Sequence, residues 1–334
     1  MRKEIKRILF VVFFLGCFLL FQNINFVDAK DADFPTKTIE FLISAGAGGS
    51  NDIAYRALNK AASMALGQPI VTINKPGANG AMAYKIVKNA APDGYTLGNV
   101  SGNSFLMPFL EEPPYNSPKD FTWIMAIGRL VYVVMVQNDA PWKNWNEFIS
   151  WAKKNPRAAK IGVNGSKAVD FKALNMWQAG RKENAEFTFI VLKSSAETLT
   201  ALLGGHINVY AMAVDTSTMS YVKEGKLRIL AFISEQKIAG YENIPSIEEM
   251  YGVGYPNFLG IGGPKGMPEP VVKRLADVYS KAMKDPEFIQ VMNRMTMPIW
   301  YLDRIAVTKY AEERFAETAK IVEKVKAEEE KKPK

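Results

Sequence analysis

Short strand signals alternate with amphipathic helix signals along most of this chain, and this alternation constrains the fold more than any other feature. Residues 38–43, 69–73 and 95–100 are apolar runs with the length and composition of buried strands. The segments between them, such as residues 52–66, place apolar side chains at helical spacing and end at a glycine or proline. This alternation predicts an α/β fold in which helices cover a parallel or mixed sheet.

The pattern restarts in the middle of the chain, which indicates two lobes. At 334 residues, the chain exceeds what a single hydrophobic core normally supports. We predict that lobe 1 comprises residues 30–128 plus 231–322 and that lobe 2 comprises residues 129–230. The connecting segments near Arg129 and Leu227 would then form a hinge, and the cleft between the lobes is the natural place for a small ligand.

Both ends of the chain differ from this pattern. Residues 1–29 are typical of a signal peptide, because positive residues precede an apolar run at residues 8–21 that is shorter than the roughly 20 residues of a membrane-spanning helix. We therefore expect a protein outside the cytoplasm, periplasmic or secreted. An uncleaved anchor and a lipid on Cys17 are alternatives. Residues 323–334 are mostly Lys and Glu, and we predict a disordered charged tail there.

Cysteine usage and charge narrow the possible functions. The only cysteine, Cys17, lies in the predicted signal peptide, so the mature chain has no disulfide and no cysteine metal site. Cleavage would remove four of the 42 Lys and Arg residues and two of the 34 Asp and Glu residues, which leaves a formal net charge of +6. This mild positive charge favours anionic ligands. We expect no nucleic-acid binding, because no basic stripe is interleaved with aromatic residues.

A glycine-rich turn at residues 44–52 joins the first predicted strand to the first predicted helix. Glycines let the backbone approach a ligand closely, and the unpaired N–H groups at a helix start attract an anion. We therefore predict that Gly48, Gly49, Ser50 and Asp52 contact a ligand. The turn lacks the Gly-Lys-Ser/Thr sequence of a phosphate-binding P-loop. An ordinary turn with a polar N-cap residue is the alternative.

Three later strand ends also lead into helix starts with glycine or small polar residues. The predicted ligand contacts at these positions are Gly165, Ser166, Ser194, Ser195 and Asp215. Strand ends that face one cleft would bring several N–H and hydroxyl donors together. Such a group of donors suits a carboxylate, because carboxylate oxygens only accept hydrogen bonds.

The sequence offers no convincing set of catalytic side chains. His206 is the only histidine, and it lies in a Gly-Gly-His turn without a cysteine partner, which is typical of a surface histidine. A Gly-x-Ser-x-Gly elbow, which would support a serine nucleophile, does not occur. We therefore expect a protein that is not an enzyme and that uses no cofactor and no metal.

Several motifs follow one another in the order seen in a known family. The most specific one is APDGYTL at residues 91–97. Others lie at residues 34–39, 48–52, 66–69, 74–80, 115–121, 202–206 and 225–228. In these motifs the chain resembles the Bug-type extracytoplasmic solute-binding proteins of tripartite tricarboxylate transporters, over nearly the whole mature chain.

This resemblance implies a two-lobed periplasmic-binding-protein fold that closes on a small carboxylated ligand. It also implies delivery of the ligand to a membrane transporter with one large and one small integral subunit. The family's first binding loop corresponds to residues 44–52 and its second-lobe loop to residues 162–166. A third contact region corresponds to Asn79, Gly80 and Ser101. We expect the protein to be a monomer.

Two departures from the family pattern bear on the ligand. Ser44 and Ala45 stand where the family usually has Pro-Phe, and Asp170 stands near the position of a usual histidine. A carboxylate of Asp170 or Asp215 that faced the cleft would repel a second acidic group and favour an ammonium. The expected ligand is a tricarboxylate, a dicarboxylate, an aromatic acid or an acidic amino acid. The alternative function is a sensory protein that presents such a ligand to a receptor kinase.

Overall fold

The computed structural model describes residues 34–77, 80–110, 113–163, 165, 170–234, 236–252 and 258–330. The predicted signal peptide, Asn79 and Ser166 lie outside these residues. All helices and strands named below belong to one compact unit, residues 37–334. Within the described ranges, no helix combines the length and the hydrophobicity needed to cross a membrane.

The first sheet combines an N-terminal part of the chain with a C-terminal part. It has six strands in the order β11-β4-β10-β3-β1-β2. These are β1 (Ile39–Ile43), β2 (Ile70–Asn74), β3 (Thr96–Ser101), β4 (Phe121–Gly128), β10 (Leu259–Pro264) and β11 (Ile299–Leu302). Strand β1 pairs in parallel with β2 and β3, whereas β10 pairs antiparallel with β3 and β4. The loops that follow β1, β2 and β3 therefore emerge at the same edge of the sheet.

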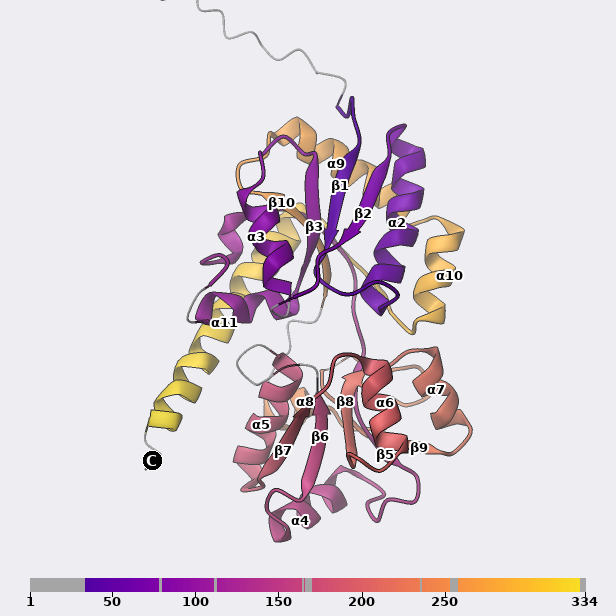
Figure 1. Ribbon diagram of the computed structural model, residues 1–334, viewed down its shortest axis with the longest axis vertical. Helices are drawn as coiled ribbons and strands as arrows, with labels where there is room; N and C mark the ends of the chain where they lie inside the picture. Colours follow the sequence, from indigo (N-terminus) through magenta and orange to yellow (C-terminus); the bar gives the residue numbers. More distant parts are fainter. Residues whose placement is uncertain are drawn as a thin grey trace, which may run out of the picture. The chain divides into compact units, whose positions relative to one another are not determined.

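Helices from both ends of the chain pack around this sheet. They are α2 (Ser50–Leu66), α3 (Ala81–Asn89), α9 (Glu269–Ala282), α10 (Pro286–Arg294) and α11 (Arg304–Glu330), with the 3₁₀ helices η2 (Gly102–Phe109) and η3 (Pro118–Asp120). Figure 1 shows the orange helices α9 and α10 near the indigo helix α2, and both pack against it. Buried tyrosines fix these distant segments: Tyr279 donates to Asn59 (3.0 Å), and Tyr55 donates to the Gly260 carbonyl (2.8 Å).

The second sheet is built from the middle of the chain. Its five strands lie in the order β7-β6-β8-β5-β9. They are β5 (Tyr132–Gln137), β6 (Ala159–Val163), β7 (Phe187–Val191), β8 (Val209–Ala213) and β9 (Leu227–Phe232). Strand β6 pairs in parallel with β7 and β8, and β5 pairs antiparallel with β8 and β9. The loops that follow β6, β7 and β8 therefore share one edge of this sheet.

Helices accompany the second sheet as the alternating pattern predicts. They are α4 (Trp145–Lys154), α5 (Phe171–Glu183), α6 (Ser195–Leu203), α7 (Thr216–Lys223) and α8 (Ile247–Tyr251). Part of the core contains side chains from β5, β8 and β9, including Val133, Met135, Tyr210 and Phe232, which are buried with Leu202 of α6. Burying this apolar surface stabilises the sheet and fixes the positions of its strand ends.

The last helix differs from the prediction. Helix α11 continues to Glu330, whereas the sequence predicts disorder from residue 323 onward. The physical reason is that Lys, Glu and Ala have high helix propensity even where they bury little surface. Residues 331–334 lie outside the described residues.

Candidate functional site

The turn between β1 and α2 is organised around a buried carboxylate. Asp52 is 3% exposed and accepts hydrogen bonds from the Gly48 N–H (2.9 Å), the Arg56 guanidinium (2.8 Å) and the Asn74 amide (2.8 Å). Burial raises the pKa of Asp52, but these hydrogen bonds and the charge of Arg56 outweigh burial, so its pKa is lowered. Asp52 therefore holds the turn closed, and protein donors already occupy its oxygens.

The start of helix α2 keeps main-chain donors available. Gly49 is the N-cap residue, with extended backbone angles and no side-chain cap hydrogen bond. The first main-chain hydrogen bond of α2 runs from the Ile53 N–H to the Gly49 carbonyl (3.0 Å). Within the described residues, the N–H groups of Ser50 and Asn51 have no acceptor. Gly48, in contrast, directs its N–H to Asp52.

A second group of polar side chains lies at the ends of β1 and β3. Asn99 accepts from the Ser44 N–H (2.7 Å) and donates to the Ser44 hydroxyl (3.1 Å). The hydroxyl of Tyr84 lies 3.4 Å from that of Ser44 and 3.3 Å from that of Ser101. Asn99 and Tyr84 are buried, whereas both serines are half-buried. The cluster thus holds two partly accessible hydroxyls at the carboxyl edge of the sheet.

Gly80 brings the loop before α3 against this cluster. Its φ of 99° is in the left-handed region, where side chains are disfavoured. A Cβ atom at this position would lie 2.8 Å from Ser44 Cβ and 3.1 Å from Tyr84 Cε2. The structure therefore places two predicted contacts, Gly80 and Ser101, beside the same pair of side chains, Ser44 and Tyr84.

In the second sheet, the predicted residues Ser194 and Asp215 cap helices. Ser194 is the N-cap residue of α6 and accepts from the Glu197 N–H (3.2 Å). Asp215 is the N-cap residue of α7 and accepts from the Thr218 N–H (2.9 Å) in a capping box. These side chains fix the first turns of α6 and α7. Gly165 is buried after the end of β6.

Two buried tyrosines meet Ala213 at the end of β8. The hydroxyl of Tyr210 donates to the Ala213 carbonyl (2.6 Å). Burial strongly raises the pKa of Tyr210, the charge of Asp215 raises it further, and a hydrogen bond with Ser195 lowers it. Tyr132, the first residue of β5, pairs with Ala213 across the sheet. Both tyrosines therefore lie at the strand end that leads to Asp215.

Sequence reasoning did not identify several of these supporting residues. Asn74, Tyr84, Asn99, Tyr132 and Tyr210 became apparent only with the structure. Asn99 carried one usable signal, since it lies between Leu97 and Val100 in a strand predicted to be buried, where a polar side chain needs a hydrogen-bond partner. Asp170 is the N-cap residue of α5, is fully buried, and pairs with Lys172 (2.9 Å).

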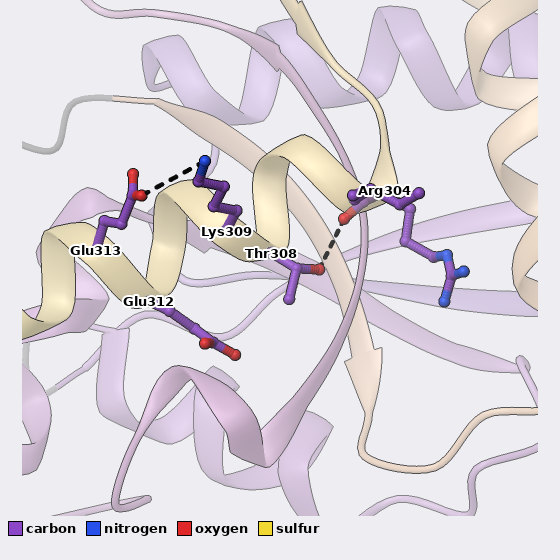
Figure 2. A pocket seen from close by; sticks show the side chains of 6 residues that line it. Arg304, Thr308, Lys309, Glu312 and Glu313 are labelled. Carbon is purple, nitrogen blue, oxygen red and sulfur yellow. Dashed lines mark hydrogen bonds and ion pairs between the residues drawn. The ribbon is translucent and has the colours of Figure 1, made fainter.

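One surface hollow lies apart from the predicted residues. It has a volume of about 490 Å³ and is lined entirely by side chains of α11, namely Arg304, Ile305, Thr308, Lys309, Glu312 and Glu313. Figure 2 shows that these side chains carry both signs of charge, with an ion pair between Lys309 and Glu313 (3.9 Å). The hollow contains none of the strand-end donors described above.

The chemistry available at the strand ends is hydrogen-bond donation. Main-chain N–H groups and serine hydroxyls gather there, and these groups recognise anions without forming covalent bonds. Among the described residues, no group of three or more His, Cys, Asp or Glu side chains could hold a metal ion.

A comparison with protein families gives an independent result. Residues 53–327 match the family described as the tripartite tricarboxylate transporter family receptor, TctC. The chain belongs to this family. The TctC family consists of solute-binding proteins and not of enzymes, in agreement with the prediction.

Relatives of known sequence or structure agree with this assignment to TctC. The UPF0065 protein in the gbd 5′ region of Cupriavidus necator is 32% identical over 298 residues, which cover 89% of this chain and 90% of that protein. A TctC solute-binding protein from Polaromonas is 26% identical with a TM-score of 0.70, covering 87% of this chain and 99% of the other. MatC from Rhodopseudomonas palustris, solved with bound malate, is 21% identical with a TM-score of 0.72, and the match covers 86% of this chain and 100% of MatC.

These similarities confirm two predictions. The resemblance to Bug-type receptors is correct, and the fold is the mixed α/β, two-lobed fold of periplasmic binding proteins. Membership of this family also supports a role as a receptor that binds a small carboxylate.

Proposed function

We propose that this chain captures a small carboxylate outside the cytoplasm and delivers it to the membrane subunits of a tripartite tricarboxylate-type transporter. The observation that carries this proposal is the start of α2, where the Ser50 and Asn51 N–H groups lack an acceptor within the described residues. A ligand carboxylate there would satisfy these donors and interact favourably with the helix dipole.

The nearby hydroxyls would complete the first half of the site. Ser44 and Ser101 are held by Tyr84 and Asn99, so their positions are fixed before a ligand arrives. Preorganised donors cost less conformational entropy on binding than mobile ones. The second half would come from Gly165 and Ser195, with Ser194 and Asp215 holding the helix starts.

Lobe closure is the mechanism that fits a binding protein without catalytic groups. The chain passes from the first sheet to the second after β4 and returns between β9 and β10, and these two passages would act as the hinge. The predicted lobes are residues 30–128 plus 231–322 and residues 129–230. The end of β9 and helix α8 pack with the second sheet, so this part of residues 231–322 would belong to lobe 2. A ligand that contacts both lobes binds the closed state more tightly and therefore shifts the population toward it.

The ligand class rests on chemistry and on a relative. MatC, which shares this fold, was solved with bound malate, a dicarboxylate. The mature chain carries a positive net charge, which attracts anions to its surface. We expect the ligand to be a di- or tricarboxylate, an aromatic acid or an acidic amino acid, bound by a monomer.

A thermal-shift screen tests the binding function. The panel contains citrate, tricarballylate, succinate, malate, aspartate, glutarate, glutamate and benzoate, with succinamide as the uncharged control. A ligand at one hundred times its Kd should add about 2.7 kcal/mol to the free energy of unfolding, and Tm should rise by several degrees. Absence of any shift at millimolar acid, or an equal shift with succinamide, would contradict the proposal.

Delivery to a transporter needs a separate test. Vesicles that contain the large and small membrane subunits should take up the labelled acid only when the loaded binding protein is present on the outside. Uptake that is independent of the binding protein would argue against the transport role. Export through residues 1–29 predicts a mature chain that starts at or within a few residues of Lys30, which mass spectrometry of the exported protein can measure.

A further inference from the structure

The first turns of helix α5 bury an unusual amount of polarity. Asp170 and Asn175 are fully buried and Lys172 is 2% exposed. These side chains lie on the amino-terminal half of α5, directly after the connection that contains Gly165. Charged side chains are almost never fully buried unless they are paired, so this arrangement needs an explanation.

Asp170 and Lys172 form a close ion pair. The Lys172 Nζ atom lies 2.9 Å from Asp170 Oδ1, which also accepts a hydrogen bond from the Lys172 N–H (2.8 Å). The same Nζ atom lies 4.9 Å from the centroid of the Tyr132 ring. Burial lowers the pKa of Lys172, but Asp170 and Tyr132 more than compensate, so its pKa is raised and the ammonium stays charged.

The pair leaves hydrogen-bonding capacity unused. Asp170 Oδ2 has no hydrogen-bond partner in the described structure, and neither atom of the Asn175 side-chain amide has one. An ammonium has three N–H donors, of which the pair uses one for Asp170. Buried polar groups are normally satisfied, so unpaired ones indicate a missing partner such as a ligand or a water molecule.

Stability alone does not explain why the pair is present. A buried ion pair is often no more stabilising than apolar residues of similar volume, because both charges lose their hydration. Lys172 and Asn175 occupy buried positions of α5, where apolar side chains would pack without the loss of hydration that polar groups suffer. A role in recognition would account for polar residues at these positions.

The pair lies next to the candidate ligand site. Tyr132, whose ring lies near the Lys172 ammonium, pairs with Ala213 at the end of β8. Asp215, the N-cap residue of α7, follows two residues later. Gly165 and Asp170 follow the end of β6, the strand beside β8. The Asp170–Lys172 pair therefore lies at the strand ends that form the second half of the proposed site.

We propose that the Asp170–Lys172 pair, with Asn175, is a specificity-determining element that favours carboxylates bearing a hydroxyl or ammonium group beside the carboxylate over their unsubstituted counterparts. Asp170 Oδ2 would accept a hydrogen bond from that group, while Lys172 or the Asn175 amide would donate to a carboxylate oxygen. The pair has no net charge, so it would recognise the hydroxyl or ammonium group without repelling an anionic ligand. This inference rests on the proposed binding function.

Matched ligand series test this inference directly. Succinate, malate and aspartate share one carbon skeleton and carry hydrogen, hydroxyl or ammonium at C2. Glutarate and glutamate form a second series, and tricarballylate and citrate form a third. The wild-type protein should bind a hydroxyl- or ammonium-bearing member at least 10-fold more tightly than the unsubstituted member of the same series, as measured by titration calorimetry.

The variant Asp170→Asn removes the negative charge but keeps an N-cap residue for α5. The preference for the substituted ligand should fall at least 10-fold, while the unsubstituted ligand should bind within about 3-fold of wild type. The double variant D170N/K172M, which also removes the partner charge and the ammonium donor, should lose the preference to the same extent and should bind every acid more weakly than D170N does. Asp285→Asn is the matched control, because Asp285 caps α10 and should leave the preference unchanged.

The outcomes separate the two proposals. A wild-type protein that binds acids but does not distinguish members of a series would overturn the role of the pair and leave the binding function intact. The same conclusion follows if D170N weakens all ligands equally, as expected when the pair only supports the fold and its unused atoms hold water. A wild-type protein that binds no acid in any series would overturn both proposals.

Discussion

Individual side chains at the candidate site act mainly as supports for the backbone around them. Asp52 closes the β1–α2 turn, Asn99 fixes Ser44, and Tyr84 bridges two serine hydroxyls. All three supports are buried and make their hydrogen bonds to other protein groups. The groups left to meet a ligand are therefore main-chain N–H groups and small hydroxyls.

Replacing Asp52 with Asn should destabilise the protein. The charge-assisted hydrogen bonds from Arg56, Gly48 and Asn74 would weaken, and we expect a loss of about 1–3 kcal/mol in the free energy of unfolding. Denaturant titration at neutral pH measures this loss. Asp303→Asn is a suitable control, because Asp303 accepts a single exposed backbone hydrogen bond.

The effect of Asp52→Asn should depend on pH. The pKa of Asp52 is lowered in the folded state, so its stabilising contribution is fully present above the unfolded pKa of about 3.9. That contribution is lost as pH falls through the lower folded pKa. The stability difference between wild type and variant should thus be constant near neutral pH and shrink in acid. A difference that grows as the pH falls would contradict this assignment.

Replacing Gly80 with Ala should damage the hydroxyl cluster. The left-handed backbone and the contact with Ser44 Cβ both oppose a side chain, and we expect a loss of about 1–3 kcal/mol in stability. Gly225→Ala is the matched control, because Gly225 has a φ of 70° but no atom within 4 Å of an added Cβ. Both variants carry backbone strain, but only G80A should also weaken ligand binding.

The residues that could be predicted are those with a local signature. Glycine and serine between a strand and a helix are visible in sequence, which is how Gly49 and Ser50 were predicted. Gly80 was predicted from the resemblance to the Bug-type family, because its segment alone indicates only a turn. Tyr84 and Asn99 reach Ser44 only because α3 and β3 lie beside β1. That arrangement depends on tertiary pairing, which no local pattern specifies.

At the scale of elements, strand β10 shows why one central strand escaped prediction. Its sequence, LGIGGP, has three glycines and no alternation of apolar and polar residues. The structure gives the reason, because a Cβ atom on Gly260 would lie 2.5 Å from the Val100 carbonyl oxygen of β3. Strands β1 to β3 and helix α2, with ordinary propensities, were predicted to within a few residues.

Gly260→Ala should therefore destabilise the first sheet. The added methyl group meets backbone and aromatic atoms that cannot move independently, and we expect a loss of about 1–3 kcal/mol. Gly46→Ala should change the free energy of unfolding by no more than about 0.5 kcal/mol, because nothing lies within 4 Å of its added Cβ. Equal stability of the two variants in urea would show that the packing argument is wrong.

At the scale of the whole molecule, two sheets share one chain. Strands β1 to β4 of the first sheet precede the second sheet in the sequence, and strands β10 and β11 follow it. The chain therefore passes between the two sheets twice. This arrangement leaves two covalent links around which the proposed lobes would move.

Ligand binding should therefore change the shape of the protein in solution. We expect a lower radius of gyration in small-angle scattering when a stabilising acid is added, because the closed state binds it more tightly. Succinamide is the control ligand and should leave the scattering curve unchanged. A curve that stays the same at saturating acid would exclude closure as the binding mechanism.

The central claim is that main-chain N–H groups at the start of α2 bind the carboxylate, and a pair of substitutions at Ser50 tests it most directly. Ser50→Pro removes the N–H donor at the first helical position, where proline is tolerated and the extended Gly49 backbone is compatible with it. Ser50→Ala removes only the hydroxyl.

Titration calorimetry with the acid that most stabilises the wild-type protein provides the measurement. We expect S50P to fold with near-wild-type stability but to bind at least 10-fold more weakly, which is about 1.4 kcal/mol, while S50A binds within about 3-fold of wild type. Equal affinity of S50P and wild type would contradict carboxylate binding by these N–H groups.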